Sequence, residues 1–177
     1  MKRITFATSA ALLALTRNVS AAAIRTALIL ESSVPELDGE LTNYFAETMR
    51  ARGVAILDPS SVRLTYHERS SVVAIALGPL VAVSAESIAW IEERYSSPRA
   101  IFARLRLSSS SLPYGEFTVN LVQAVCSFRC MNVRSRQIIK AASARSERRG
   151  EELEATQSLA ANAAILEVAR SSAAALV

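Results

Sequence analysis

The order of the apolar segments over residues 24–57 constrains the fold of this chain more than any other feature. Residues 24–31 form a short, nearly continuous apolar run, which is typical of a strand covered on both faces. Apolar side chains then recur at helical spacing, and Gly53 stands where a left-handed helix cap is needed. These side chains are Leu37, Leu41, Tyr44, Phe45 and Met49. A second apolar run, 54–57, ends at Asp58-Pro59, so the pattern predicts a strand–helix–strand unit with parallel strands and a right-handed crossover.

The segments that surround this unit are less regular. Ser33 and Glu36 have the spacing of a capping box, which predicts the start of the helix there. Residues 72–83 fit either a strand pair broken at Gly78-Pro79 or a buried helix, because periodicity does not separate the two. Ser84 can cap a helix that runs to residue 95, with Ile88 and Ile91 facing the core.

The second half of the chain predicts antiparallel strands and a final helix. Residues 101–107 alternate as a strand does, and we expect the serines 108–111 to form a loop before Pro113-Tyr114-Gly115. Residues 117–132 and 138–146 predict a long antiparallel hairpin that turns around 134–137. A helix over 151–176 is expected to begin with Glu151 and Glu152 in its first turn. Its expected inward side chains are Leu159, Ala163, Leu166 and Ala169.

Together these elements predict one α/β (α+β) domain over residues 22–177. It contains a single mixed β-sheet with a βαβ unit, a long antiparallel hairpin and a C-terminal helix packed on the sheet. About 156 residues are enough for one domain with a substantial core. The sequence contains neither an internal repeat nor a long glycine- or proline-rich linker.

Residues 1–21 have the pattern of a cleavable signal peptide. Lys2 and Arg3 precede an uncharged, largely apolar block over 4–16, and Val19-Ser20-Ala21 supplies the small residues of a cleavage site. A mitochondrial transit peptide is the alternative, because Arg17 and Arg25 add charge and no acid precedes Glu31. The apolar block is shorter than the ~20 residues that span a bilayer, so we expect a periplasmic or secreted protein without stable membrane insertion.

The net charge gives little support for nucleic-acid binding. The chain has 20 Lys+Arg and 16 Asp+Glu, but 3 of the basic side chains and none of the acidic ones lie in residues 1–21, which leaves about +1. The stretch 129–149 is nevertheless basic. We identify Arg134, Arg136 and Lys140 as candidate partner-binding residues, with an ordinary solvated surface as the alternative interpretation.

Cys126 and Cys130 lie on one side of the strand predicted over 117–132. Positions four apart on a strand are about 13 Å from each other, which exceeds the reach of a disulfide. We therefore expect two buried free thiols. A bridge within C-x-x-x-C, or half of a metal site with His67, is the alternative.

No set of residues forms a catalytic constellation, so we expect neither an enzyme nor a cofactor. His67 is the single histidine, no G-x-S-x-G occurs, and neither cysteine lies in a nucleophile motif. Glu92-Glu93 and Glu151-Glu152 are adjacent on helices, so their side chains point in different directions. We identify no catalytic, cofactor-binding or metal-binding residue and no small-molecule substrate.

Three segments carry a resemblance to a known group of proteins. They are the helix and strand LDGELTNYFAETMRARG-VAILD (37–58), the turn NVRSRQII (132–139) and the closing helix over 150–166. In this order they resemble the periplasmic anticodon-binding-like α/β modules of bacterial envelope assembly. Such modules occur in the Tol protein N-terminal domain, the penicillin-binding-protein activator lipoprotein, the curli secretion lipoprotein and flagellar assembly protein T. Asn132 and Arg136 replace the Asp and Gly common in the family's turn, and the leader's end has no Cys for a lipid anchor.

The resemblance implies an exported, non-enzymatic binding or assembly module that contacts an envelope protein partner. Two alternatives remain open at this point. One is a small secreted hydrolase or effector enzyme that uses His67, and the other is a polyanion-binding protein that uses the basic hairpin 129–149.

Overall fold

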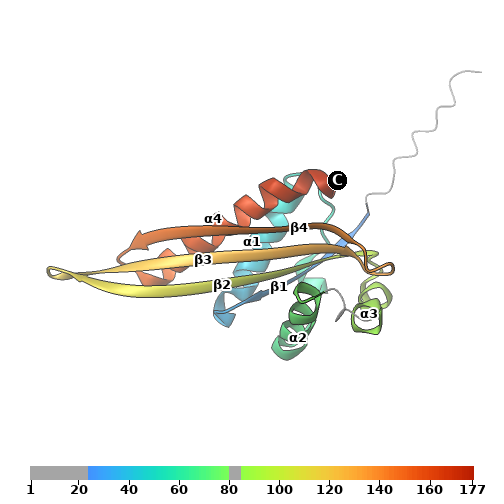
Figure 1. Ribbon diagram of the computed structural model, residues 1–177, viewed down its shortest axis with the longest axis horizontal. Coiled ribbons are helices and arrows are strands. Elements are labelled where there is room, and N and C mark those ends of the chain that lie inside the picture. The colour runs from blue at the N-terminus through green and yellow to red at the C-terminus, as the bar shows by residue number, and fades with distance from the viewer. Residues whose placement is uncertain (1–23, 80–84) are drawn as a thin grey trace, which may run out of the picture.

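Within residues 24–79 and 85–177, which the computed structural model describes, four strands form one mixed sheet (Figure 1). The strands lie side by side in chain order: β1 (Thr26–Ser32), β2 (Arg99–Tyr114), β3 (Phe117–Asn132) and β4 (Ile138–Gly150). β1 is parallel to β2, whereas β2 with β3 and β3 with β4 are antiparallel. With the helix α4 (Leu153–Ser172) packed on the sheet, this architecture confirms the predicted fold class.

Helix α1 (Asp38–Arg50) follows β1, as predicted, but it does not begin at the expected capping box. Pro35 starts a 3-10 turn (Pro35–Leu37), and the cap position of α1 has no side-chain hydrogen bond. Ser33 is engaged elsewhere, because its hydroxyl accepts a hydrogen bond from the Leu107 amide at 2.8 Å. At the other end, Gly53 has φ +86°, which confirms the left-handed cap.

The predicted second strand, 54–57, is reduced to a single parallel bridge between Thr26 and Ile56. Asp58-Pro59 starts a further 3-10 turn (Pro59–Ser61) directly after this bridge. The proline fixes φ and lacks an N–H, so the segment leaves the edge of β1 early. The parallel partner of β1 along its length is instead β2.

Residues 66–77 form helix α2 (Tyr66–Leu77), so the helical alternative for the run 72–83 is correct as far as Leu77. A capping box between Thr65 and Glu68, which was not among the expected helix starts, begins this helix. Helix α3 (Ala85–Tyr95) buries Ile88 and Ile91, as expected. The proposed cap Ser84 lies outside the described residues. None of the described helices has the length and apolarity to cross a membrane.

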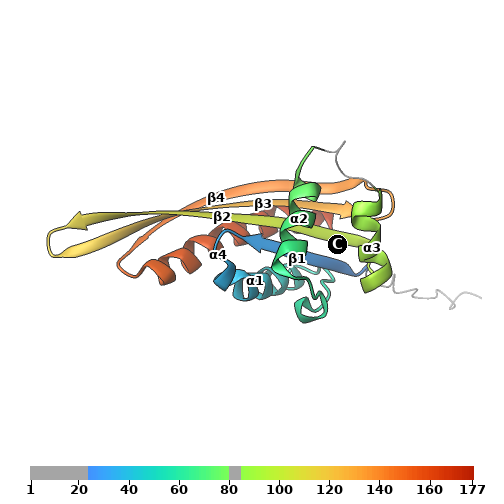
Figure 2. The same cartoon turned by 90° about the horizontal axis from the view of Figure 1, so that it is seen from below.

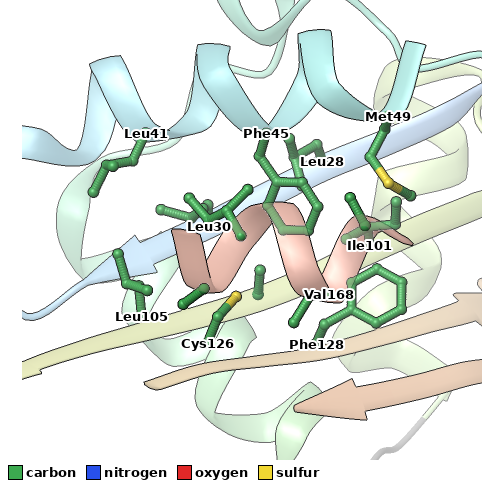
Figure 3. Close-up of a cluster of buried hydrophobic side chains, with 14 of the residues drawn as sticks. Leu28, Leu30, Leu41, Phe45, Met49, Ile101, Leu105, Cys126, Phe128 and Val168 are labelled. Carbon is green, nitrogen blue, oxygen red and sulfur yellow. The ribbon is translucent and has the colours of Figure 1, made fainter. Parts of the chain in front are cut away.

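Two apolar layers enclose the sheet. Helices α1 and α4 pack on one face, where Phe45 of α1 lies against Phe128 of β3 with ring centroids 6.1 Å apart (Figure 3). Helices α2 and α3 pack on the other face, over β1 and β2 (Figure 2). Aliphatic side chains fill both layers, and the many alanines of α4 let that helix approach the sheet closely.

The inward face of α4 differs from the expected one. Leu159 is 61% exposed, and Ala163 and Leu166 are half-buried, whereas Ala169 is buried as predicted. The buried face consists of Thr156, Ala160, Ala161, Ala164, Ile165, Val168, Ala169 and Ser172. The helix also begins at Leu153, so Glu151 and Glu152 precede its first turn.

Candidate functional site

The β2–β3 hairpin extends past the helices as a two-stranded ribbon (Figures 1 and 2). β4 pairs with β3 as far as Asn120, which lies opposite Gly150. Beyond that pair, β2 and β3 continue alone to a turn at Gly115, which has φ +64°. We call residues 111–120 the projecting ribbon.

The serines 108–111 belong to this hairpin, so the predicted loop is wrong. Ser108 pairs with Gln123 and Ser111 with Asn120, and both pairs continue the regular antiparallel register. Backbone pairing with β3, in which buried and more exposed side chains alternate, therefore overrides the low strand propensity of serine. Side chains anchor the base of the ribbon, because Ser111 Oγ donates to Asn120 Oδ1 and Asn120 Nδ2 donates to the Glu151 carbonyl, each at 2.7 Å.

Apolar side chains gather on one face of the ribbon. Tyr114 lies opposite Phe117 and Leu112 opposite Val119, so the period of the strands places all four on the same side. Leu112 is 56% exposed, Tyr114 76% and Phe117 62%. We call these four residues the tip face. A cluster of exposed aromatic and aliphatic side chains of this kind commonly marks an interaction surface.

The predicted partner-binding residues lie far from the tip face, around the β3–β4 turn beside α3 (Figure 1). Arg134 forms a two-pronged ion pair with Glu92 of α3, with N–O distances of 2.7 and 3.1 Å. Arg136 is exposed at φ +59°, and Lys140 is half-buried on β4. The structure thus brings these three residues to one end of the sheet, where Arg134 already has an acidic partner.

The basic stretch 129–149 does not form one cationic patch. Arg129 donates to two carbonyl oxygens at the end of α2, at 2.6 and 2.9 Å. Arg145 lies on the same side of the sheet and donates to a glutamine of β3 at 2.6 Å. Lys140 and Arg148 occupy alternate positions, so they point to the other side. The strand period therefore divides the charges that are adjacent in sequence.

The residues considered for chemistry do not converge. His67 is exposed in the first turn of α2, and the described residues contain no group of three or more His, Cys, Asp or Glu side chains that could hold a metal ion. Cys126 and Cys130 are buried free thiols, as predicted. Burial raises the pKa of each thiol to about 12, so both stay protonated near neutral pH.

Comparison with known proteins identifies the fold. No family model and no curated protein matches the sequence. The hypothetical protein CT253 from Chlamydia trachomatis superposes with a TM-score of 0.51 at 11% identity, over 86% of this chain and 96% of that one. The chain shares its fold with CT253. Lipoprotein GNA1162 from Neisseria meningitidis gives a TM-score of 0.48 at 12% identity, over 82% of this chain and 98% of that one.

The tip face was not predicted because the sequence around its residues has the signals of a turn and a loop rather than those of a strand. Pro113 and Gly115 predict a turn, and the polar run before them resembles a loop. One signal was available: Leu112 and Tyr114 alternate with polar or turn residues, as do Phe117 and Val119. Extending the hairpin pattern backwards from β3 would have paired these residues across the turn.

Proposed function

We propose that this chain is an exported, non-enzymatic binding module of the bacterial cell envelope, and that its projecting ribbon contacts a protein partner. The observation that carries the proposal is the tip face. Leu112, Tyr114 and Phe117 are more than half exposed at the end of a ribbon that extends beyond the helices. Side chains of this size normally lie in a core, and each gains about 1.5–3 kcal/mol when it is fully buried.

The geometry of the ribbon suits protein recognition better than it suits catalysis. Tyr114 and Phe117 are neighbours across the two strands, and they have few rotatable bonds to immobilise on binding. Aromatic anchors of this type dominate the energetics of protein interfaces. The anchoring bonds between the ribbon base and the start of α4 hold the tip face in a defined direction.

The envelope location rests on the sequence. Residues 1–21 have the charge, apolar block and small residues of a secretory leader. The mixed sheet backed by helices agrees with the fold class of the periplasmic modules that the sequence resembles. Mass spectrometry of the N-terminus tests this part, since we expect a chain that begins near Ala22 in the periplasmic fraction. A full-length chain in the cytosol would contradict it.

Site-specific photo-cross-linking tests the ribbon. A photoreactive phenylalanine analogue at position 114 should give a discrete cross-linked protein in cells that export the full chain. The same analogue at Ser109 is the matched control, because this exposed residue of β2 points to the opposite side of the sheet. Phe117→Ser should reduce the cross-link at 114 by more than about tenfold, because the loss of a buried aromatic anchor costs about 2 kcal/mol or more.

Two outcomes would refute the role of the ribbon. One is an equal cross-linking pattern from positions 109 and 114, and the other is an unchanged pattern in the Phe117→Ser variant. Far-UV circular dichroism controls for folding, and it should be unaffected because Phe117 lies outside both apolar layers.

A further inference from the structure

The outer edge of β1 has an unpaired stretch of backbone. Thr26 uses this edge fully, since its N–H donates to the Ala55 carbonyl at 2.8 Å and its carbonyl accepts from the Leu57 N–H at 3.0 Å. Every second residue of a strand presents its N–H and C=O to the same side, so those of Leu28 and Leu30 also point to this edge. No described residue pairs with them there.

The unpaired N–H and C=O groups of Leu28 and Leu30 lower the stability of the fold. Leu28 is 2% exposed and Leu30 is 1% exposed, and nearly all buried backbone groups in proteins have a hydrogen-bond partner. The edge is closed just beyond them, because the Ser32 N–H donates to Asp38 Oδ1 at 2.8 Å. Two residues, Leu28 and Leu30, therefore have an unpaired backbone edge between the bridge at Thr26 and the carboxylate of Asp38. We call this stretch the window.

A cleft of about 220 Å³ lies against this window. It occupies the space into which the segment 54–57 would have continued if Asp58-Pro59 had not turned it away. Helix α1 forms one wall and the segment 59–64 forms the other, and Figure 2 shows β1 at the sheet edge beside α1. The lining is partly apolar and partly neutral polar: Pro59, Val62, Leu64, Thr42, Asn43 and Ser60.

The charges on the cleft wall are already balanced. Asp38 Oδ2 accepts a hydrogen bond from Arg69 Nη1 at 2.7 Å, and both residues line the cleft. A ligand with a strong net charge would gain little from this pair. An uncharged ligand that offers alternating hydrogen-bond donors and acceptors fits the cleft better.

We propose that the cleft binds an extended segment of another polypeptide, which adds to the sheet as a short fifth strand beside β1. A peptide backbone supplies a carbonyl and an N–H at every second residue, about 6.6 Å apart, which is the spacing from Leu28 to Leu30. Small or aliphatic uncharged side chains would lie against Val62 and Leu64. This site goes beyond the proposed ribbon contact, since it uses a different edge of the sheet and no residue of the tip face.

Gly39 provides a way to block the cleft without disturbing the core. It lines the cleft on α1, and a Cβ at this position would have no neighbour within 4 Å. Gly39→Leu should therefore fill the cleft while the helix stays folded. Glu40→Leu is the matched control, because Glu40 is exposed on the same helical turn and does not line the cleft. Asn43→Phe, at an exposed position of the lining, is a second blocking variant in case Gly39→Leu fails to fold.

The probe is a set of nonapeptides selected from a random phage-displayed library against the full chain. We expect selected peptides to be rich in small and aliphatic uncharged residues. Their Kd, measured by fluorescence anisotropy, should rise at least tenfold in Gly39→Leu and stay unchanged in Glu40→Leu. N-methylation of alternate peptide residues should abolish binding in one register and be tolerated in the other, because only one set of N–H groups faces β1.

Other results would overturn the proposal. A library that yields no cleft-dependent peptide, or a Kd that is equal in Gly39→Leu and Glu40→Leu, excludes the site. Equal effects of both N-methylation registers would exclude strand addition. Self-association that Gly39→Leu abolishes, without peptide binding, would assign the edge to a second copy of the chain instead. Phe117→Ser should leave the peptide Kd unchanged, so failure of the ribbon proposal and failure of this one are distinguishable.

Discussion

Replacement of Gly150 by Ala tests how closely the end of β4 approaches the start of α4. A Cβ at position 150 would overlap Thr156 Oγ1, which is too close for any real contact. The threonine has little freedom to move, because it is 3% exposed and its hydroxyl donates to the Glu152 carbonyl at 2.5 Å. Overpacking of this kind costs about 1–3 kcal/mol, which in a chain of this size lowers the Tm by about 4–8 °C for 2 kcal/mol.

Urea and thermal unfolding, followed by far-UV circular dichroism, measure this cost, and two further variants isolate its cause. Gly39→Ala is the matched control, since its new methyl group meets nothing and a helical Gly→Ala change is neutral or stabilising by up to ~1 kcal/mol. In a Thr156→Ala background, Gly150→Ala should cost at least ~1 kcal/mol less than in the wild type, because the overlapping hydroxyl is absent. An equal cost in both backgrounds, or no cost at all, would refute the reasoning.

The remaining predictions concern the two buried cysteines, the buried carboxyl group of Asp38 and the backbone of Gly53. Because burial raises the pKa of Cys126 and Cys130 to about 12, iodoacetamide at pH 8 should modify neither thiol until urea unfolds the chain, as read by mass spectrometry. The two thiols also make stability depend on pH. The free energy of unfolding should fall as pH rises above about 9, because there only the unfolded state releases the thiol protons. Burial, the largest effect, also raises the pKa of Asp38 above 3.8, so in urea titrations the wild type should lose stability relative to Asp38→Asn as pH rises from about 4. The asparagine of that variant still offers an oxygen to the Ser32 N–H, whereas Asp38→Ala does not and should be less stable than Asp38→Asn at every pH. Gly53→Ala should lower the unfolding free energy by ~1–2 kcal/mol in the same assay, because φ is +86° there, and an unchanged value would contradict the left-handed cap.

The parts of the fold that were predictable from sequence are those in which local signals agree. Helix α1 has a clear helical period and a glycine, Gly53, at the left-handed position after it, and β3 and β4 each follow the period of a strand. The inward face of α4 was misplaced because alanines surround this helix, and burial then depends on how closely each Cβ approaches the sheet. The tendency to place leucine inside failed at Leu159, which is 61% exposed.

The tip face and the peptide cleft were harder to predict from the sequence, because both depend on contacts between residues that are distant in the chain. The serines 108–111 become a strand through their pairing with β3, which no local propensity indicates. The peptide cleft depends on how early Asp58-Pro59 diverts the chain from β1, and the sequence predicted the stop without showing which backbone groups it leaves unpaired. The partner-binding assignment to Arg134, Arg136 and Lys140 stays a prediction, now with Glu92 as a competitor for Arg134.

The last strand of the sheet has a consequence for how copies of the chain behave at high concentration. β4 ends the strand order, so one side of its backbone has no neighbouring strand among the described residues. An open edge of 13 residues is a template for stacking into fibrils. Lys140, Arg145, Arg148 and Arg149 space positive charge along it, so two such edges repel each other when they align. Neutralising these side chains would remove that repulsion, and a high salt concentration would screen it in the unchanged chain, so either change favours edge-to-edge stacking.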